Sequence, residues 1–201
     1  MFMRVTHVLA SPEQLERTIT EFEERVMPAV RQAEDYAGSA LFVNRATGEA
    51  SGVTFWQSAQ ALAASGPVGS ATRTQAAAAT GFAVVDVERF QVVFIDRAGP
   101  ARTPSYTRVD NGHTALERLD DFANFVRDSV VPALRRLDGY RSTTIGVDRT
   151  SGAVMVRSDW ETVEDREASN PSFVPVLQRA AEFTLNPIRV DLFEQVVAEL
   201  L

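Results

Sequence analysis

His7 lies in the apolar and β-branched segment 2–10 and is one of the two histidines in the chain. A histidine can act as a general base because its unperturbed pKa is near neutrality. Asn111 occupies the corresponding position of a similar segment 104 residues later, so a polar side chain recurs at this place. We predict that His7 and Asn111 are catalytic candidates that position or activate a substrate. The alternative for both is a partly buried polar residue whose hydrogen bonds are satisfied within the fold.

Two aromatic pairs recur at the same offset. Trp56 and Trp160 each close a β-prone segment, where they could line a catalytic site or simply contribute buried area to a core. Tyr36 and Tyr140 could bind a substrate, or could attach the end of a helix to a sheet. We include the tryptophans among the catalytic candidates and the tyrosines among the substrate-binding candidates.

Arg73 and Arg179 lie in segments that we expect to form the second helix of each half. A guanidinium group in a cleft could hold the phenolate or carboxylate of a ligand through charge-assisted hydrogen bonds. The alternative is an exposed arginine in a salt bridge. We predict that both arginines are substrate-binding residues.

The composition excludes several kinds of chemistry. The chain of 201 residues has no cysteine, and all 20 of its basic residues are arginine. Thiolate nucleophiles, cysteine-ligated metals and Schiff-base lysines are therefore excluded. The sequence shows no paired carboxylates, no interpretable Ser-His-Asp set and no glycine-rich phosphate loop. We predict no metal and no cofactor.

The charge and the apolar pattern bear on partners and location. A net charge of −7 disfavours the phosphate attraction on which nucleic-acid binding depends, so we expect no nucleic-acid partner. No apolar run approaches the length of a membrane span, and the N-terminal residues lack the pattern of a signal peptide. We therefore expect a cytoplasmic protein that does not bind a membrane.

The elements that must position these residues are duplicated. The hexapeptide Val26–Arg31 recurs as Val130–Arg135, and the match is ungapped from Arg4 to Trp56 of the first copy. This repeat indicates two units of about 100 residues, each large enough to form a core. We predict repeats at 1–97 and 104–201, joined by a linker at 98–103 that contains proline and glycine.

Each repeat reads as β-α-β-β-α-β. A strand at 2–10 leads to a helix that begins at Ser11, and Ser11 with Gln14 matches a capping box. Pro28 and Pro132 fall inside the first helices, so each helix is either kinked or divided into two shorter pieces. A hairpin around Gly48 or Gly152, a second helix and a closing strand complete each copy.

This plan is ferredoxin-like. A four-stranded sheet with helices on one face leaves its other face apolar and bare. We therefore predict an α+β fold of two tandem ferredoxin-like (βαββαβ) repeats that pack sheet to sheet as a pseudo-dimeric α/β barrel. Whether the chain also forms a homodimer stays open.

The repeated motif resembles the antibiotic biosynthesis monooxygenase-like group of the dimeric α/β-barrel superfamily. The features that carry the resemblance are the V-x-P-A-[VL]-R helix, the glycine turn and the closing tryptophan of each copy. The resemblance implies a fold shared by cofactor-independent oxygenases of polycyclic aromatic substrates, heme-degrading oxygenases, isomerases and members without known activity.

The heme-degrading members use an Asn, a Trp and an iron-ligating His. Asn111 and Trp160 match the first two, but neither second helix contains histidine, so iron chemistry of that kind is disfavoured. In the aromatic-substrate oxygenases a Trp lines the cleft, and Trp56 and Trp160 match it by position. The resemblance implies a cofactor-independent monooxygenase that acts on a bulky aromatic or polyketide-like molecule. The alternative is a non-catalytic module that binds a small hydrophobic ligand or a protein partner.

Overall fold

The computed structural model describes residues 1–100 and 102–200. Residue 101 of the predicted linker and residue 201 of the predicted second repeat lie outside the described residues. The elements of the first half are β1 (Phe2–Leu9), α1 (Pro12–Glu21), the π-helical turn η1 (Phe22–Val26), α2 (Met27–Arg31), β2 (Tyr36–Val43), β3 (Glu49–Trp56), α3 (Ala59–Ala64), α4 (Gly66–Thr80) and β4 (Ala83–Arg97).

The second half repeats this order. Its elements are β5 (Ser105–His113), the short 3₁₀ helix η2 (Leu116–Arg118), α5 (Leu119–Phe125), the π-helical turn η3 (Val126–Val130), α6 (Val131–Leu134), β6 (Tyr140–Val147), β7 (Ala153–Trp160), α7 (Val163–Ala168), α8 (Asn170–Ala180) and β8 (Arg189–Leu200). The predicted α+β class and the β-α-β-β-α-β order of each copy are confirmed.

The strands are hydrogen-bonded in the order β1-β3-β2-β8-β5-β7-β6-β4 and form a closed antiparallel barrel. The chain forms two compact units: Met1–Arg89 together with the segment from Glu194 onward, and Phe90–Phe193. The chain therefore passes from one unit to the other within β4, and again within β8. These divisions differ from the boundaries of the sequence repeat at 1–97 and 104–201, which stay a prediction.

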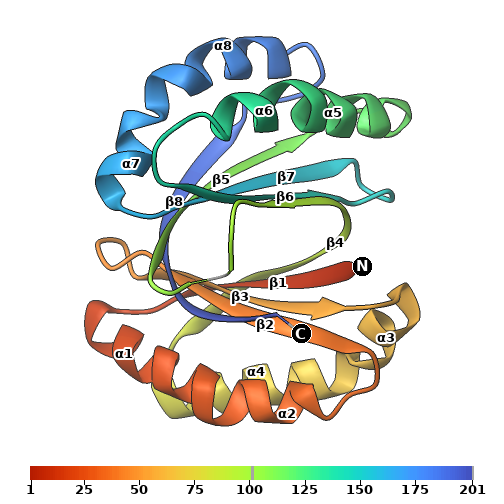
Figure 1. The fold of residues 1–201 in the computed structure, drawn as a ribbon. Helices are drawn as coiled ribbons and strands as arrows, with labels where there is room; N and C mark the ends of the chain where they lie inside the picture. The colour runs from red at the N-terminus through yellow and green to blue at the C-terminus, as the bar shows by residue number, and fades with distance from the viewer. Residues whose placement is uncertain (101, 201) are drawn as a thin grey trace. The chain divides into compact units, whose positions relative to one another are not determined.

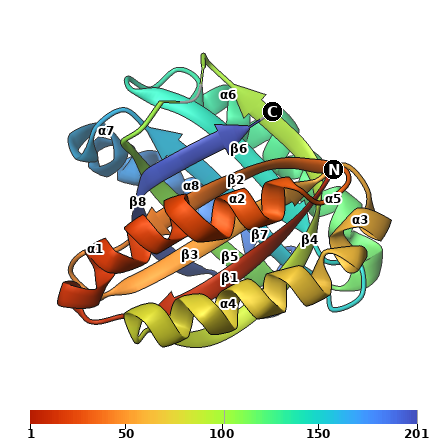
Figure 2. The same cartoon turned by 90° about the horizontal axis from the view of Figure 1, so that it is seen from below.

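In the first unit, helices cover one face of the sheet (Figures 1 and 2). β3 pairs with both β1 and β2, and α1 and α4 lie side by side across these strands. In the second unit β7 pairs with β5 and β6, and α5, α6, α7 and α8 lie on one face of that sheet.

The tight turns before β3 and β7 require glycine. Gly48 has φ +78°, and a Cβ there would lie 1.9 Å from the carbonyl oxygen of Ala10. Gly152 has φ +82°, and its Cβ would lie 2.3 Å from the carbonyl oxygen of Thr114. Positive φ and close backbone approach together explain why each copy keeps a glycine at this turn.

The first helix of each unit shows how its proline is accommodated. The capping box of Ser11 and Gln14 is present at the start of α1, as predicted. The helix then widens into a π-helical turn, η1, and continues as α2 with Pro28 in its first turn. The second unit repeats this with η3 and Pro132. The missing proline N–H thus falls where the helical hydrogen-bond pattern already changes.

Candidate functional site

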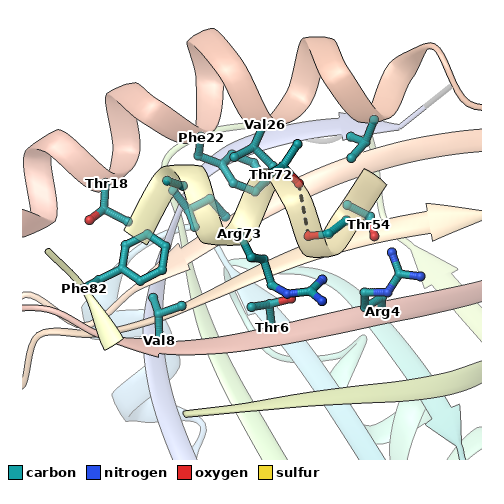
Figure 3. Close-up of a pocket in the computed structure, with 15 residues that line it drawn as sticks. Arg4, Thr6, Val8, Thr18, Phe22, Val26, Thr54, Thr72, Arg73 and Phe82 are labelled. Atoms are coloured by element: carbon teal, nitrogen blue, oxygen red, sulfur yellow. Dashed lines mark hydrogen bonds between the residues drawn. The ribbon is translucent and has the colours of Figure 1, made fainter. Parts of the chain in front are cut away.

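The first unit contains a cavity of about 70 Å³, partly open to solvent, between the sheet and the layer formed by α1, η1 and α4 (Figure 3). Most of its lining is apolar and comes from the sheet, from both long helices and from Phe82. Its polar lining comes from two arginines and four threonines. These are Arg4, Thr6, Thr18, Thr54, Thr72 and Arg73.

Arg4 reaches this cavity from β1, and its side chain is only 3% exposed. Its Nη2 donates hydrogen bonds to the carbonyl oxygen of Leu62 at 2.6 Å and to Oγ of Ser65 at 3.0 Å. Burial, together with the positive charges of Arg73 and Arg89, lowers the pKa of Arg4 to about 10. Arg4 is therefore a buried cation whose hydrogen-bond partners are neutral.

Arg73 reaches the same place from α4. A Cβ built on Gly69 would lie 2.7 Å from Nη1 of Arg4 and 3.2 Å from Nη1 of Arg73, so both guanidinium groups converge beside this glycine. Figure 3 shows the side chain of Arg73 extending toward Thr6 and Arg4. Burial lowers the pKa of Arg73, and Arg89 adds to the effect. Within residues 1–100 and 102–200, no carboxylate forms an ion pair with Arg4 or Arg73.

The second unit has a smaller cavity, of about 30 Å³, in the corresponding place. Arg108, which matches Arg4, donates from Nε to both carboxylate oxygens of Asp110 at 3.1 and 3.0 Å and from Nη2 to Oδ1 at 2.8 Å. Its Nη1 donates to Oδ1 of Asn170 at 3.2 Å, and its Cζ lies 4.2 Å from the ring centroid of Phe173. Burial raises the pKa of Asp110, and the hydrogen bonds from Arg108 offset part of that increase.

The offset of 104 residues holds through this region, because Ser65 matches Ser169 and Pro67 matches Pro171. Three of the differences between the two cavities change charge or fill space beside the arginine: Thr6 is replaced by Asp110, Gly69 by Phe173 and Arg73 by Leu177. The second cavity therefore contains an internal counter-ion and an added aromatic ring, and it lacks the second arginine.

His7 lies on the opposite face of the first sheet, because Arg4, Thr6 and Val8 face the cavity and side chains alternate along a strand. Its Nδ1 is 3.0 Å from Oγ of Ser51 and its Nε2 is 2.7 Å from Oε2 of Glu88. These contacts satisfy both ring nitrogens, which matches the structural alternative for this residue.

Asn111 has the same placement in the second unit. Its Nδ2 donates to Oδ2 of Asp191 at 2.9 Å, while Asp110 and Gly112 on either side of it line the cavity. The structure therefore does not bring His7 or Asn111 to either cavity. A catalytic role for either residue stays a prediction, and it would have to operate on the other face of the sheet.

Both tryptophans are fully buried. Nε1 of Trp56 donates to Oγ1 of Thr54 at 3.1 Å, and that of Trp160 donates to Oγ of Ser158 at 3.3 Å. Neither ring lines either of these two cavities, although the Trp56 ring centroid is 6.0 Å from Cζ of Arg4. Trp56 therefore contacts the site through Arg4 and Thr54, which both line the cavity.

The tyrosines stack edge-to-face on these tryptophans, with ring centroids 5.8 Å apart in both units. The hydroxyl of Tyr36 forms hydrogen bonds with Oγ of Ser39 at 2.6 Å and with Oε2 of Glu199 at 3.1 Å. Burial raises the pKa of Tyr36 to about 12. The hydroxyl of Tyr140 donates to Oδ2 of Asp96 at 2.8 Å and also lies 2.8 Å from Oγ1 of Thr143, and burial raises the pKa of Tyr140 as well. Both hydroxyls are thus engaged away from the cavities.

The two predicted arginines are placed differently. Arg73 lines the first cavity, whereas Arg179 is exposed on α8, with Cζ 5.2 Å from the ring centroid of Phe125. Sequence reasoning did not assign a role to Arg4. The available signal was the recurrence of an arginine at the same strand position as Arg108.

No group of three or more His, Asp or Glu side chains is placed to bind a metal ion among the described residues. No helix within residues 1–100 and 102–200 has the length and apolarity needed to cross a membrane.

Comparison with protein families gives no matching family model. Two relatives from Mycobacterium tuberculosis cover most of the chain. The uncharacterized protein Rv2557 is 24% identical over 196 residues, which is 96% of this chain and 87% of that protein. The uncharacterized protein Rv2558 is 25% identical over 202 residues, which is 100% of this chain and 85% of that protein.

Solved structures match over nearly the whole chain. An anthrone oxidase-like protein superimposes with a TM-score of 0.74 at 12% identity, covering 99% of this chain and 93% of the other. The heme-degrading enzyme LmHde from Listeria monocytogenes superimposes with a TM-score of 0.56 at 8% identity, covering 96% of this chain and 99% of the other. A ferredoxin-fold protein from the same species, related to antibiotic biosynthesis monooxygenases, superimposes with a TM-score of 0.53 at 8% identity, covering 98% of this chain and 95% of the other.

These matches define the class of fold. The chain has the ferredoxin-like barrel fold of proteins related to the antibiotic biosynthesis monooxygenases, and the resemblance indicated by the repeated motif is confirmed at that level.

Proposed function

We propose that the first unit binds a small aromatic molecule in the cavity between α1, η1 and α4 and oxidises it as a cofactor-independent monooxygenase. The observation that carries this proposal is the cavity itself, in which an apolar lining ends at two converging arginines, Arg4 and Arg73. An apolar pocket with a few convergent polar groups is typical of small-molecule sites.

The size of the cavity limits what it holds. Its volume of about 70 Å³ is below the roughly 150 Å³ at which an engineered protein cavity binds benzene. A single ring therefore needs only a modest widening between the helices. The further rings of a bulky or polyketide-like substrate would extend through the open side.

The arginines suit an oxidation that proceeds through an anion. Two guanidinium groups lower the pKa of a bound phenol or enol because they stabilise its conjugate base. That electron-rich anion can supply the electrons to dioxygen itself. One oxygen atom enters the ring to give a quinone and the other leaves as water, so no external reductant is required.

Oxygen uptake provides the test. We would incubate the protein with anthrone or 1-naphthol in the presence of a metal chelator and follow dissolved oxygen and quinone absorbance. Arg73→Leu is expected to reduce the rate at least about ten-fold, since one charge-assisted contact is lost. His7→Ala changes the opposite face of the sheet and distinguishes the predicted catalytic histidine from the cavity. Absence of uptake with the wild-type protein would reject the oxidation.

A second candidate is a non-catalytic protein that binds a small hydrophobic ligand. It is favoured by the lack of any histidine or carboxylate among the residues that line the first cavity, because no side chain there is a conventional base. Saturable ligand binding without oxygen uptake is the result that selects this candidate.

Two further predictions belong to the same proposal. The first is a cytoplasmic location, and the second is a chain that forms a pseudo-dimer within itself, with a homodimer of two chains left open. Light scattering of the purified protein over a range of concentrations measures the number of chains in the particle. Fractionation of the source cells tests the location.

A further inference from the structure

Arg4 and Arg108 occupy equivalent positions, but their charges are balanced differently. Arg108 binds the carboxylate of Asp110 on the same strand. The residue equivalent to Asp110 in the first unit is Thr6, which carries no charge. Arg4 is buried as deeply as Arg108 and faces a second arginine as well.

A buried cation without a counter-ion is costly in a protein interior. Arg73 and Arg89 make the first cavity more positive still, although the chain as a whole has a net charge of −7. Within the part of the chain that the structure describes, no residue accepts a hydrogen bond from Nε or Nη1 of Arg4. The cavity therefore has the charge, the free donors and the space for an anion.

The second unit shows which anion suits this arginine. Asp110 accepts three hydrogen bonds from Arg108, and both of its carboxylate oxygens take part. A planar carboxylate matches the planar fork of a guanidinium group. Asp110 thus occupies the place that a ligand carboxylate would take beside Arg4.

We infer that the first cavity binds an organic carboxylate, with the carboxylate held by Arg4 and Arg73 and a small apolar body packed among Phe22, Val26 and Phe82. This inference rests on the proposed use of the cavity as a ligand site and names the class of its ligand. The second cavity is closed to such a ligand, because Asp110 and Phe173 already occupy the corresponding space.

The test compares two ligands of nearly the same shape, one with a charged carboxylate and one with a neutral carboxamide. 4-Fluorobenzoate and 4-fluorobenzamide have the same ring, and fluorine NMR detects the weak binding of either one. The wild-type protein is expected to bind the acid at least about ten-fold more tightly than the amide, because hydrogen bonds to an ionised group are the stronger ones.

Thr6→Asp copies the counter-ion of the second unit into the first. It is expected to abolish the preference for the acid, since Asp at position 6 would neutralise Arg4 from within. Thr6→Asn has nearly the same volume without the charge and is expected to keep the preference even if both ligands bind more weakly. Thr20→Asp adds the same charge at an exposed position of α1 and controls for net charge.

Arg73→Leu is a second route to the same answer, because Leu177 shows that leucine is tolerated at this helix position. It is expected to reduce the preference for the acid without unfolding the protein. Equal binding of acid and amide by the wild-type protein would overturn the carboxylate inference and leave the cavity proposal standing. Failure of the wild-type protein to bind either ligand would overturn both.

Discussion

Phe173 holds in the second unit the position that Gly69 holds in the first. The ring of Phe173 lies over Arg108, whereas the absence of a side chain at Gly69 leaves the space in which Arg4 and Arg73 meet. This exchange between a glycine and a phenylalanine is therefore one of the differences that leave the first cavity larger than the second in two copies of one fold.

Gly69→Phe should close the first cavity. The new Cβ would meet only the flexible ends of two arginines, and phenylalanine has a better helix propensity than glycine. We expect binding of 4-fluorobenzoate to be lost while the free energy of unfolding changes by less than about 1 kcal/mol. Gly66→Ala is the control on the same helix, because no atom lies within 4 Å of its added Cβ, and it should leave binding unchanged.

Arg73→Leu should make the unliganded protein more stable. It removes a positive charge that lowers the pKa of Arg4, and it copies Leu177 of the second unit. We expect a gain of up to about 1 kcal/mol, or roughly 2–4 °C in the melting temperature. Calorimetry without ligand measures this, and a fall in melting temperature would contradict the view that the two arginines repel each other.

Asp110→Asn should destabilise the second unit. The buried ion pair contributes little net stability as a whole, but removing the charge of one partner leaves Arg108 uncompensated, at a cost of about 3 kcal/mol or more. Urea unfolding gives the change. Asp128→Asn breaks an exposed ion pair with Arg127 and should have little effect on the same measurement.

The ion pair between Asp96 and Arg135 should make the free energy of unfolding depend on pH in the acidic range. Hydrogen bonds from Arg135 lower the pKa of Asp96 below its ordinary value of 3.8, and the hydroxyl of Tyr140 adds to this. A carboxyl group with a lowered folded-state pKa stabilises the protein above its unfolded-state pKa, and this contribution is lost as the pH falls through the folded-state value.

Asp96→Asn should therefore cost stability at neutral pH, and the difference from the wild-type protein should shrink below about pH 4. Urea midpoints measured from neutral to acidic pH provide the comparison. A difference that stays constant over that range would show that the ionised form of Asp96 does not carry the stabilisation.

Much of the fold could be predicted because its signals are local. The capping box at Ser11, the turns at Gly48 and Gly152 and the repeated hexapeptides each act within a few residues. The outcome at Pro28 could not be predicted, since a kink, a break and a π-helical turn all accommodate a proline. The choice depends on how the helix packs against the sheet.

The site was only partly predictable for a related reason. Arg73 was identified from its helix, but Arg4 and His7 lie on one strand and face opposite sides of it. Met3, Arg4 and Val5 are all buried, so both faces of that part of the strand are covered. The strand therefore shows no alternation of buried and exposed residues that would assign its two faces. The exchange of Thr6 for Asp110 was visible in the sequence, but its meaning depends on burial.

The exchange of strand segments between the units has a consequence for biosynthesis. Residues of β2 pair with the end of β8, with Ala40 opposite Ala198. A ribosome completes the whole of the second unit before it makes those final residues. The first unit, which carries the open cavity, is therefore left with an unpaired edge at β2 until the second unit has been made.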